Sequence, residues 1–420
     1  MMMSMYSAVS GLKSQQTKLN VIGNNIANIN TVGYKSQKVG FSDLLSQNIS
    51  GASGASGTMG GKNAKQIGLG SQVSSIEMVM NPGSSQYTGS DTDVAIGGEG
   101  FFIVQGNTEG MRYYTRAGNF GVDESGNLVV NGMKVCGYDP APPSNITPLN
   151  IFNSPGTKDG AKYTLQKTAT KTASLMGNFD NSKTTAASQT EVATTLTVYD
   201  SLGNTHETVL TFKNQAPPNS LKWDVTATTK DGTVAIDPTP FTVEFNGTGT
   251  MTSATSLDLK FTAFGTGADD STVKVDLTGL FGGASASGTS NVKVSDIDGY
   301  DTGMLQDFSI GTDGTITGSY SNGLKKSLGQ LAMMTFSNPS GLEKIGDNLY
   351  DRTMNSGEPT PGTPGSGQAA KLTTGALEMS NVDLANEFSE MMITQRAYQA
   401  NSKIITTSDT LMETLINMSR

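Results

Sequence analysis

The sequence predicts a mainly β protein whose two ends are α-helices that pair with each other. Apolar residues near both ends recur at alternating steps of three and four, which is the spacing of one helix face. Between them the chain reads as short strands and turns, with 50 glycines among 420 residues and only 35% hydrophobic residues. We therefore expect an α-helical, coiled-coil-like terminal domain and two nested β domains between its helices.

The terminal helices are expected at residues 1–30 and 380–420. Ser380 followed by Asp383 resembles a capping box, which places the second helix start at Ser380. A lone pair of helices buries one stripe of each, so the remaining apolar surface is expected to contact other copies of the chain. The alternative is a hairpin packed on the chain's own β domain. The candidate polymer-interface residues are Leu12, Leu19, Ile22, Ile26, Phe388, Met391, Tyr398, Ile405, Leu411 and Leu415.

The region between the helices divides by composition. Residues 31–90 and 355–379 are rich in Gly, Ser and Pro and are predicted to be linkers. Residues 91–146 together with 293–354 are expected to form a discontinuous first β domain, in which Asn131-Gly132 is a hairpin turn signal. Residues 147–292 are expected to form an inserted outer β domain, with Trp223 in its core.

Composition also argues against several classes of function. A net charge of -9 does not suit phosphate neutralisation, so nucleic acid is not an expected partner. The chain lacks a run of about 18 apolar residues, so we expect no membrane span. The N-terminus lacks the pattern of a conventional signal peptide.

The chain offers little material for an active site. His206 is its only histidine and is predicted to lie on the surface, so neither a catalytic triad nor a histidine metal site is expected. The segment from Asp296 to Asp301 lacks the closing Glu of a calcium loop and reads as a turn. We predict no catalytic, cofactor-binding or metal-binding residue, and no enzyme activity.

The sequence allows more than one interpretation of Cys136 and of the asparagines near the end of the first helix. Cys136 is the single cysteine, which excludes an internal disulfide, and it is predicted to be a buried or neutral thiol. The sequence leaves open whether Cys136 joins neighbouring subunits covalently.

A group of asparagines is predicted to end the first helix, because Asn is a poor helix former. These residues are Asn24, Asn25, Asn28 and Asn30. The alternative is polar bonding between subunits, in which case Asn25→Ala would weaken a polymer and spare the monomer.

Several segments resemble a known family. SGLKSQQTKLNVIGNNIANINTVGYKS (Ser10 to Ser36) is similar to the N-terminal signature of the bacterial flagellar rod and hook proteins. GALEMSNVDLANEFSEMMITQRAYQANSKIITTSDTLMETLINMSR (Gly375 to Arg420) resembles the C-terminal signature. DVAIGGEGFFIVQ, YTRAGNFGVDESGNLVV, TVYDSLGNTHETVLTF and LGQLAMMTFSNPSGLEKIGDNLY resemble segments of hook members of the family. The resemblance covers about half of the chain and is weakest in the middle.

The resemblance implies a structural subunit that assembles with itself into a flexible helical tube, the hook, which passes torque from rod to filament. It implies as partners the rod, hook-cap and hook-filament junction proteins and the flagellar export apparatus, and export to the cell surface without a cleaved signal peptide. A distal rod protein is the nearest alternative, and the expected inserted domain favours the hook. A secreted glycan-binding adhesin is an alternative of another class, suggested by the Thr/Ser-rich middle.

Overall fold

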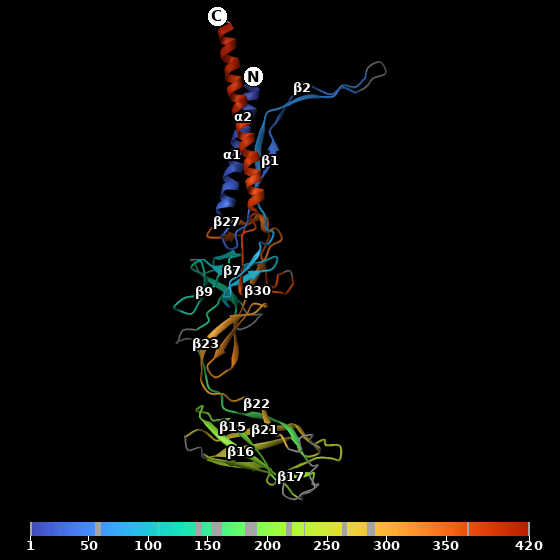
Figure 1. Ribbon diagram of the computed structural model, residues 1–420, viewed down its shortest axis with the longest axis vertical. Helices are drawn as coiled ribbons and strands as arrows, with labels where there is room; N and C mark the ends of the chain where they lie inside the picture. The colour runs from blue at the N-terminus through green and yellow to red at the C-terminus, as the bar shows by residue number, and fades with distance from the viewer. Residues whose placement is uncertain are drawn as a thin grey trace. The chain divides into compact units, whose positions relative to one another are not determined.

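In the part of the chain that the structure describes, the protein is mainly β with one long helix near each end (Figure 1). This computed structural model confirms the predicted fold class. The chain divides into two compact units, of which unit 1 contains residues 1–154, 308–318 and 326–420, and unit 2 contains residues 155–307 and 319–325. The described residues are 2–54, 60–106, 108, 110–139, 145–152, 162–180, 191–215, 221–230, 232–262, 267–283, 290–367 and 369–418.

The two helices of unit 1 are α1 (Met2–Ala27) and α2 (Leu384–Met418), which pack side by side (Figure 1). The Asp383 carboxylate accepts hydrogen bonds from the backbone N–H groups of Ala385 at 2.9 Å and Asn386 at 3.3 Å. Asp383 is therefore the N-cap of α2. The predicted start at Ser380 was wrong, because the Ser380 hydroxyl accepts a 3.4 Å bond from the Val382 N–H and does not cap the helix. No helix of the described residues is long and apolar enough to cross a membrane.

Both stretches expected to be linkers contain strands. In the first, β1 (Gln37–Asp43) pairs antiparallel with β4 (Ser71–Met78), and β2 (Ser46–Ser50) pairs with β3 (Lys65–Gly68). In the second, three strands pair with strands from earlier in the chain, so each stretch supplies backbone partners that composition does not reveal. These pairs are β31 (Ala376–Glu378) with β5 (Ser85–Tyr87), β30 (Leu372–Thr374) with β6 (Val94–Ile96), and β29 (Thr360–Gly362) with β26 (Met333–Thr335). Residues 55–59 of the Ser/Gly/Ala tract lie outside the described residues.

The β core of unit 1 is centred on β7 (Phe101–Gln105), which pairs with β8 (Arg112–Thr115), β11 (Met133–Tyr138) and β26. Phe101 makes edge-to-face contacts with Phe336 and Tyr350 at centroid distances of 5.7 and 5.6 Å. Such aromatic pairs add to the stabilisation that a core gains from the apolar area it buries.

Unit 1 also contains shorter elements. They are β9 (Gly121–Val122), β10 (Leu128–Val130), β12 (Ile146–Pro148), a 3₁₀ turn (Pro339–Gly341), β27 (Glu343–Gly346) and β28 (Leu349–Asp351). Three strands contain residues of both units: β23 (Gly303–Ile310), β24 (Thr315–Tyr320) and β25 (Lys325–Leu331).

Unit 2 contains two sheets that share one apolar core. Alternate residues of the strands point into it, as the period of two in their burial shows. Trp223 is 0% exposed, which confirms its predicted place in the core. The five-stranded sheet has the order β18 (Thr233–Asp237), β20 (Ser256–Thr262), β21 (Ser271–Gly282), β14 (Thr172–Phe179) and β22 (Lys293–Ile297). The four-stranded sheet has the order β15 (Glu191–Tyr199), β16 (Thr205–Asn214), β17 (Lys222–Thr229) and β19 (Phe241–Glu244), and a short strand β13 (Thr164–Leu165) precedes both.

His206 corrects an expectation. It was predicted to lie on the surface, but it is only 2% exposed, because its place in the alternation of β16 points it inward. Its Nε2 lies 3.1 Å from Oδ2 of Asp200, which is fully buried. Asp200 also accepts hydrogen bonds from the backbone N–H groups of Leu202 and Asn204, so the pair holds the turn before β16.

Candidate assembly surface

Small and polar side chains make the contact between α1 and α2. A Cβ at Gly11 would lie 2.8 Å from Nδ2 of Asn401, so the two helices approach closely at this point. The described buried residues of α2 are Thr394 and Ser408. Lys18 on α1 forms a 2.9 Å salt bridge with Glu390 on α2.

A second face of α1 lies on the β1–β4 hairpin. The Ser14 and Ser71 hydroxyl oxygens are 3.3 Å apart, and the Ser10 hydroxyl accepts a 3.4 Å bond from the Ser71 N–H. Gly70 has a φ of +120°, and a Cβ there would lie 2.1 Å from the Ser10 hydroxyl. Because a side chain at position 70 would collide with α1, glycine is required for the hairpin to lie this close.

Asn25 connects α1 to two other segments of its own chain. Its amide nitrogen donates to the Gln37 carbonyl at 2.9 Å and to Glu387 at 3.0 Å. Its amide oxygen accepts from the Gln37 N–H at 3.0 Å and from the Tyr34 hydroxyl at 3.2 Å. The side chain is 1% exposed, so the alternative in which Asn25 bonds a neighbouring subunit was wrong. We now expect Asn25→Ala to destabilise the monomer.

Three charged side chains meet where the helices join the β core. The Lys35 ammonium lies 2.6 Å from Oε1 of Glu378, and Arg116 Nη1 lies 3.3 Å from Oε2 of the same carboxylate. Lys35 also donates to the Asn81 carbonyl at 2.8 Å, and the Gly83 N–H donates to Glu378 at 3.2 Å. All three side chains are buried. We call them the junction cluster.

The predicted interface residues are distributed over several environments. Ile22 is buried, which removes it from any free surface. Half-buried positions are Leu12, Leu19, Ile26, Met391 and Ile405, and exposed positions are Phe388, Tyr398, Leu411 and Leu415. The prediction missed Met392, Ile393 and Ile416, which are also exposed apolar residues of α2. It also missed the helix contact at Gly11, whose signal was the run of small residues Ala8, Gly11 and Ser14 at steps of three.

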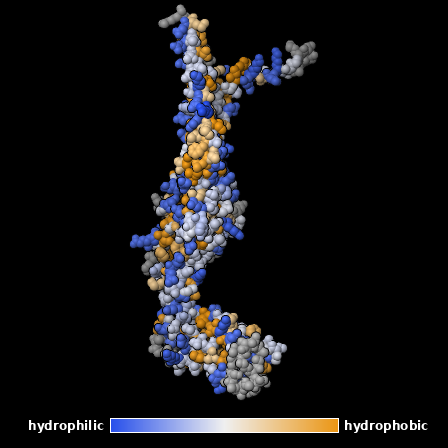
Figure 2. All heavy atoms as spheres, in the orientation of Figure 1, coloured by the Kyte–Doolittle hydropathy of each residue, from blue (hydrophilic) through white to orange (hydrophobic). Residues whose placement is uncertain are grey.

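Apolar side chains are exposed along α2. Every described residue from 411 to 418 is exposed, and Leu411, Leu415, Ile416 and Met418 are among them. Figure 2 shows apolar residues gathered in patches on the visible face of the helices and the adjoining strands. Scattered apolar residues are normal on a surface, but a succession along one helix indicates an interaction surface.

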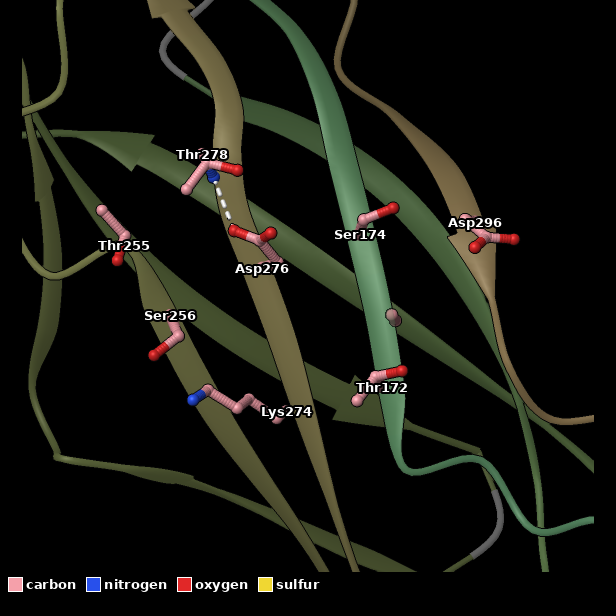
Figure 3. Close-up of a pocket in the computed structure, with 9 residues that line it drawn as sticks. Thr172, Ser174, Thr255, Ser256, Lys274, Asp276, Thr278 and Asp296 are labelled. Atoms are coloured by element: carbon pink, nitrogen blue, oxygen red, sulfur yellow. Dashed lines mark hydrogen bonds between the residues drawn. The ribbon is translucent and has the colours of Figure 1, made fainter.

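A pocket of about 440 Å³ lies on the five-stranded sheet of unit 2 (Figure 3). Most of its lining residues have polar side chains, with Lys274, Asp276 and Asp296 among serines and threonines. Asp276 accepts a 2.9 Å bond from the Thr278 N–H and so stabilises its own strand (Figure 3). The lining includes neither histidine nor cysteine, and the described residues hold no cluster of three or more potential metal ligands.

Four family models match successive parts of the chain. A curated relative, the flagellar hook protein FlgE of Treponema pallidum, is 36% identical over 472 residues and covers 100% of both chains. This chain belongs to the flagellar hook protein FlgE family. The models are "Flagella basal body rod protein" (residues 5–35), "Flagellar hook protein FlgE/F/G D1 domain" (95–154), "Flagellar basal body protein FlaE D2 domain" (164–300) and "Flagellar basal body rod FlgEFG protein C-terminal" (373–418).

Two further proteins are similar to this chain, a curated rod protein and a hook protein of known structure. The flagellar basal-body rod protein FlgG of Bacillus subtilis is 31% identical over 421 residues and covers 100% of both chains. A protein with a rod name thus spans the full length of this chain, so length does not separate hook from rod. The crystal structure of Helicobacter pylori flagellar hook protein FlgE2 covers 71% of this chain and 100% of its own, at 16% identity and a TM-score of 0.49.

Proposed function

We propose that this chain is the structural subunit of a bacterial flagellar hook and that it assembles with copies of itself into a flexible helical tube. The tube transmits torque from the rod to the filament and lies at the cell surface after export without a cleaved signal peptide. One observation supports self-assembly above the others: α2 exposes a succession of apolar side chains, whereas its buried residues among those described are Thr394 and Ser408. Membership in the FlgE family supports the hook in particular.

The physical argument for a polymer rests on which surfaces the chain leaves uncovered. Exposed apolar area on α2 is stabilised by burial, at about 25 cal/mol per Å². Identical subunits that repeat one head-to-tail contact form an open helical filament when the rotation does not close. We propose that the predicted interface residues other than the buried Ile22 contribute to this contact, with the exposed Phe388, Tyr398, Leu411 and Leu415 facing the neighbouring subunit.

The β2–β3 hairpin offers a second uncovered surface. Leu45 and Ile49 are 80% and 60% exposed, and Ile67 is 45% exposed. Ile67 lies opposite Gln47, which shares a strand face with Leu45, so apolar side chains gather on one face of the hairpin. An isolated two-stranded hairpin is marginally stable in water. We expect this face to be covered in the assembled polymer.

Electron microscopy of the purified full chain after salting-out tests the proposal. Leu411→Ser with Leu415→Ser should prevent tube formation, because burial of each leucine contributes about 1.5–3 kcal/mol and the pair should raise the critical concentration at least about a hundredfold. The thermal unfolding midpoint of the monomer should not change. Met354→Ser, at a fully exposed position in the turn after β28, is the control. Normal tubes from the double variant would contradict the role of α2.

The shape of the tubes separates the hook from the distal rod. Curved or supercoiled tubes support a hook, and straight, stiff tubes support a rod. The rod, hook-cap and junction proteins and the export apparatus are proposed partners on the basis of family membership. The adhesin alternative predicts a specific signal on a glycan array and no ordered polymer.

A further inference from the structure

The junction cluster contains two cations and one carboxylate. Lys35, Arg116 and Glu378 are each 2% exposed or less, so water provides little screening of the second positive charge. Glu387, another carboxylate of this region, bonds to Asn25 and to neither cation. One carboxylate balances the charge of only one of the two cations, and excess buried charge is costly, so a second anion or the loss of a proton from Lys35 would stabilise the cluster.

Two buried hydrogen-bond donors of this region have no acceptor among the described residues. Arg116 Nε and the Tyr350 hydroxyl are buried, and neither has a hydrogen-bond partner among the described residues. Both side chains lie against Phe101: the Arg116 guanidinium carbon is 5.1 Å from its ring centroid, and the centroid of the Tyr350 ring is 5.6 Å from it. Burial raises the pKa of Tyr350, so its hydroxyl stays a donor. Unsatisfied buried donors are rare in folded proteins and indicate a missing acceptor.

We infer that the junction cluster binds one small monovalent anion of the halide class, held by Arg116 Nε and the Tyr350 hydroxyl beside Lys35. A halide is an acceptor for both donors and carries the charge that Glu378 leaves unbalanced. A neutral Lys35 would remove the excess charge but would leave both donors without an acceptor. A water molecule would serve the donors but would leave the charge. A single halide satisfies both conditions, whereas a neutral Lys35 would need a bound water molecule as well.

Equilibrium dialysis of the full chain against ³⁶Cl⁻, with sodium methanesulfonate holding the ionic strength constant, measures binding directly. We expect saturable binding of about one chloride per chain and a thermal unfolding midpoint that rises with chloride concentration, because a ligand that binds the native state stabilises it. Bromide should compete. Tyr350→Phe removes one donor and should weaken binding at least about tenfold.

Two further variants locate the site. Lys35→Met balances the charge without an anion and should abolish the chloride dependence of unfolding. Tyr114→Phe, a buried tyrosine that packs on Phe336 outside the cluster, is the matched control and should bind chloride as the unchanged chain does. If Lys35→Met fails to fold, the comparison of Tyr350→Phe with Tyr114→Phe still decides. The inference is wrong if chloride shows no saturable binding. It is also wrong if Tyr350→Phe binds chloride as tightly as the unchanged chain does, because that result means an adventitious ion only.

Discussion

Cys136 shows how burial sets the reactivity of a single residue. It is 3% exposed, and burial raises the pKa of its thiol to about 11, which the nearby Arg112 charge only partly opposes. The thiolate is the reactive form, so little of it exists at neutral pH. The burial of the thiol confirms the prediction and argues against a covalent link between subunits through this residue.

We therefore expect Cys136 to react with a thiol reagent at pH 8 at least about a hundredfold more slowly in the native chain than in denaturant. Absorbance with a chromogenic disulfide reagent measures both rates. Polymers dissociated by boiling under reducing conditions should give only monomer by mass spectrometry. A covalent dimer, or equal rates in the two states, would contradict this expectation.

Glu378 tests the junction cluster at the level of one side chain. Glu378→Gln leaves two buried cations without a carboxylate and should lower the free energy of unfolding by about 3–5 kcal/mol, measured by urea denaturation. Glu358→Gln is the matched control, because Glu358 is 90% exposed in its pair with Arg352. The control should change stability by less than about 1 kcal/mol. Equal effects would show that burial of the cluster is unimportant.

The sequence predicted the fold class, the helices and the core position of Trp223, because those follow from local periodicity and residue type. It did not predict the junction cluster, since Lys35, Arg116 and Glu378 meet only after the chain has folded back on itself. The prediction put His206 on the surface, although it is buried, because alternating polar and apolar residues along a strand do not show which face of the strand is buried. The assignment of the helix stripes to a polymer contact stays a prediction, because a single chain cannot show what covers them.

At the level of elements, the closeness of α1 and α2 depends on Gly11. A Cβ at this position meets Asn401, whereas a Cβ at Gly23 meets nothing within 4 Å. The two glycines lie in the same helix, so their intrinsic cost to helix stability is similar. They differ in what surrounds them, which makes them a matched pair.

Gly11→Leu should separate the helices and lower the thermal midpoint of the helical circular dichroism signal, because overpacking costs about 1–3 kcal/mol. Gly23→Leu should leave that midpoint unchanged or raise it, since leucine is a better helix former than glycine. Circular dichroism of both variants, each as a monomer, measures the difference. The importance of the close approach is refuted if the two variants melt alike.

At the level of the whole molecule, the chain consists of two compact units with separate apolar cores. The division into a helical domain, linkers and two nested β domains remains our proposal for how these units are organised. Inter-domain boundaries of this kind commonly allow each unit to unfold on its own. Trp223 reports on unit 2, because its side chain lies in that core.

We expect two transitions in the calorimetric unfolding of the full-length monomer. Trp223→Ala should cost about 3–5 kcal/mol and shift the transition of unit 2 alone, because it leaves a large cavity in that core. Glu378→Gln should shift the other transition alone. A single transition that moves with both variants would show that the two units unfold together.

The burial of Cys136 also allows a chemical label to be attached at one chosen position of the chain. Because the one natural cysteine is inaccessible in the native state, a cysteine introduced at Leu45 on the exposed hairpin or at Leu415 on α2 would be the single reactive site of the molecule. A fluorophore or spin label could then be attached without first removing Cys136. Distances between such labels in a growing polymer would map which surfaces of neighbouring subunits meet.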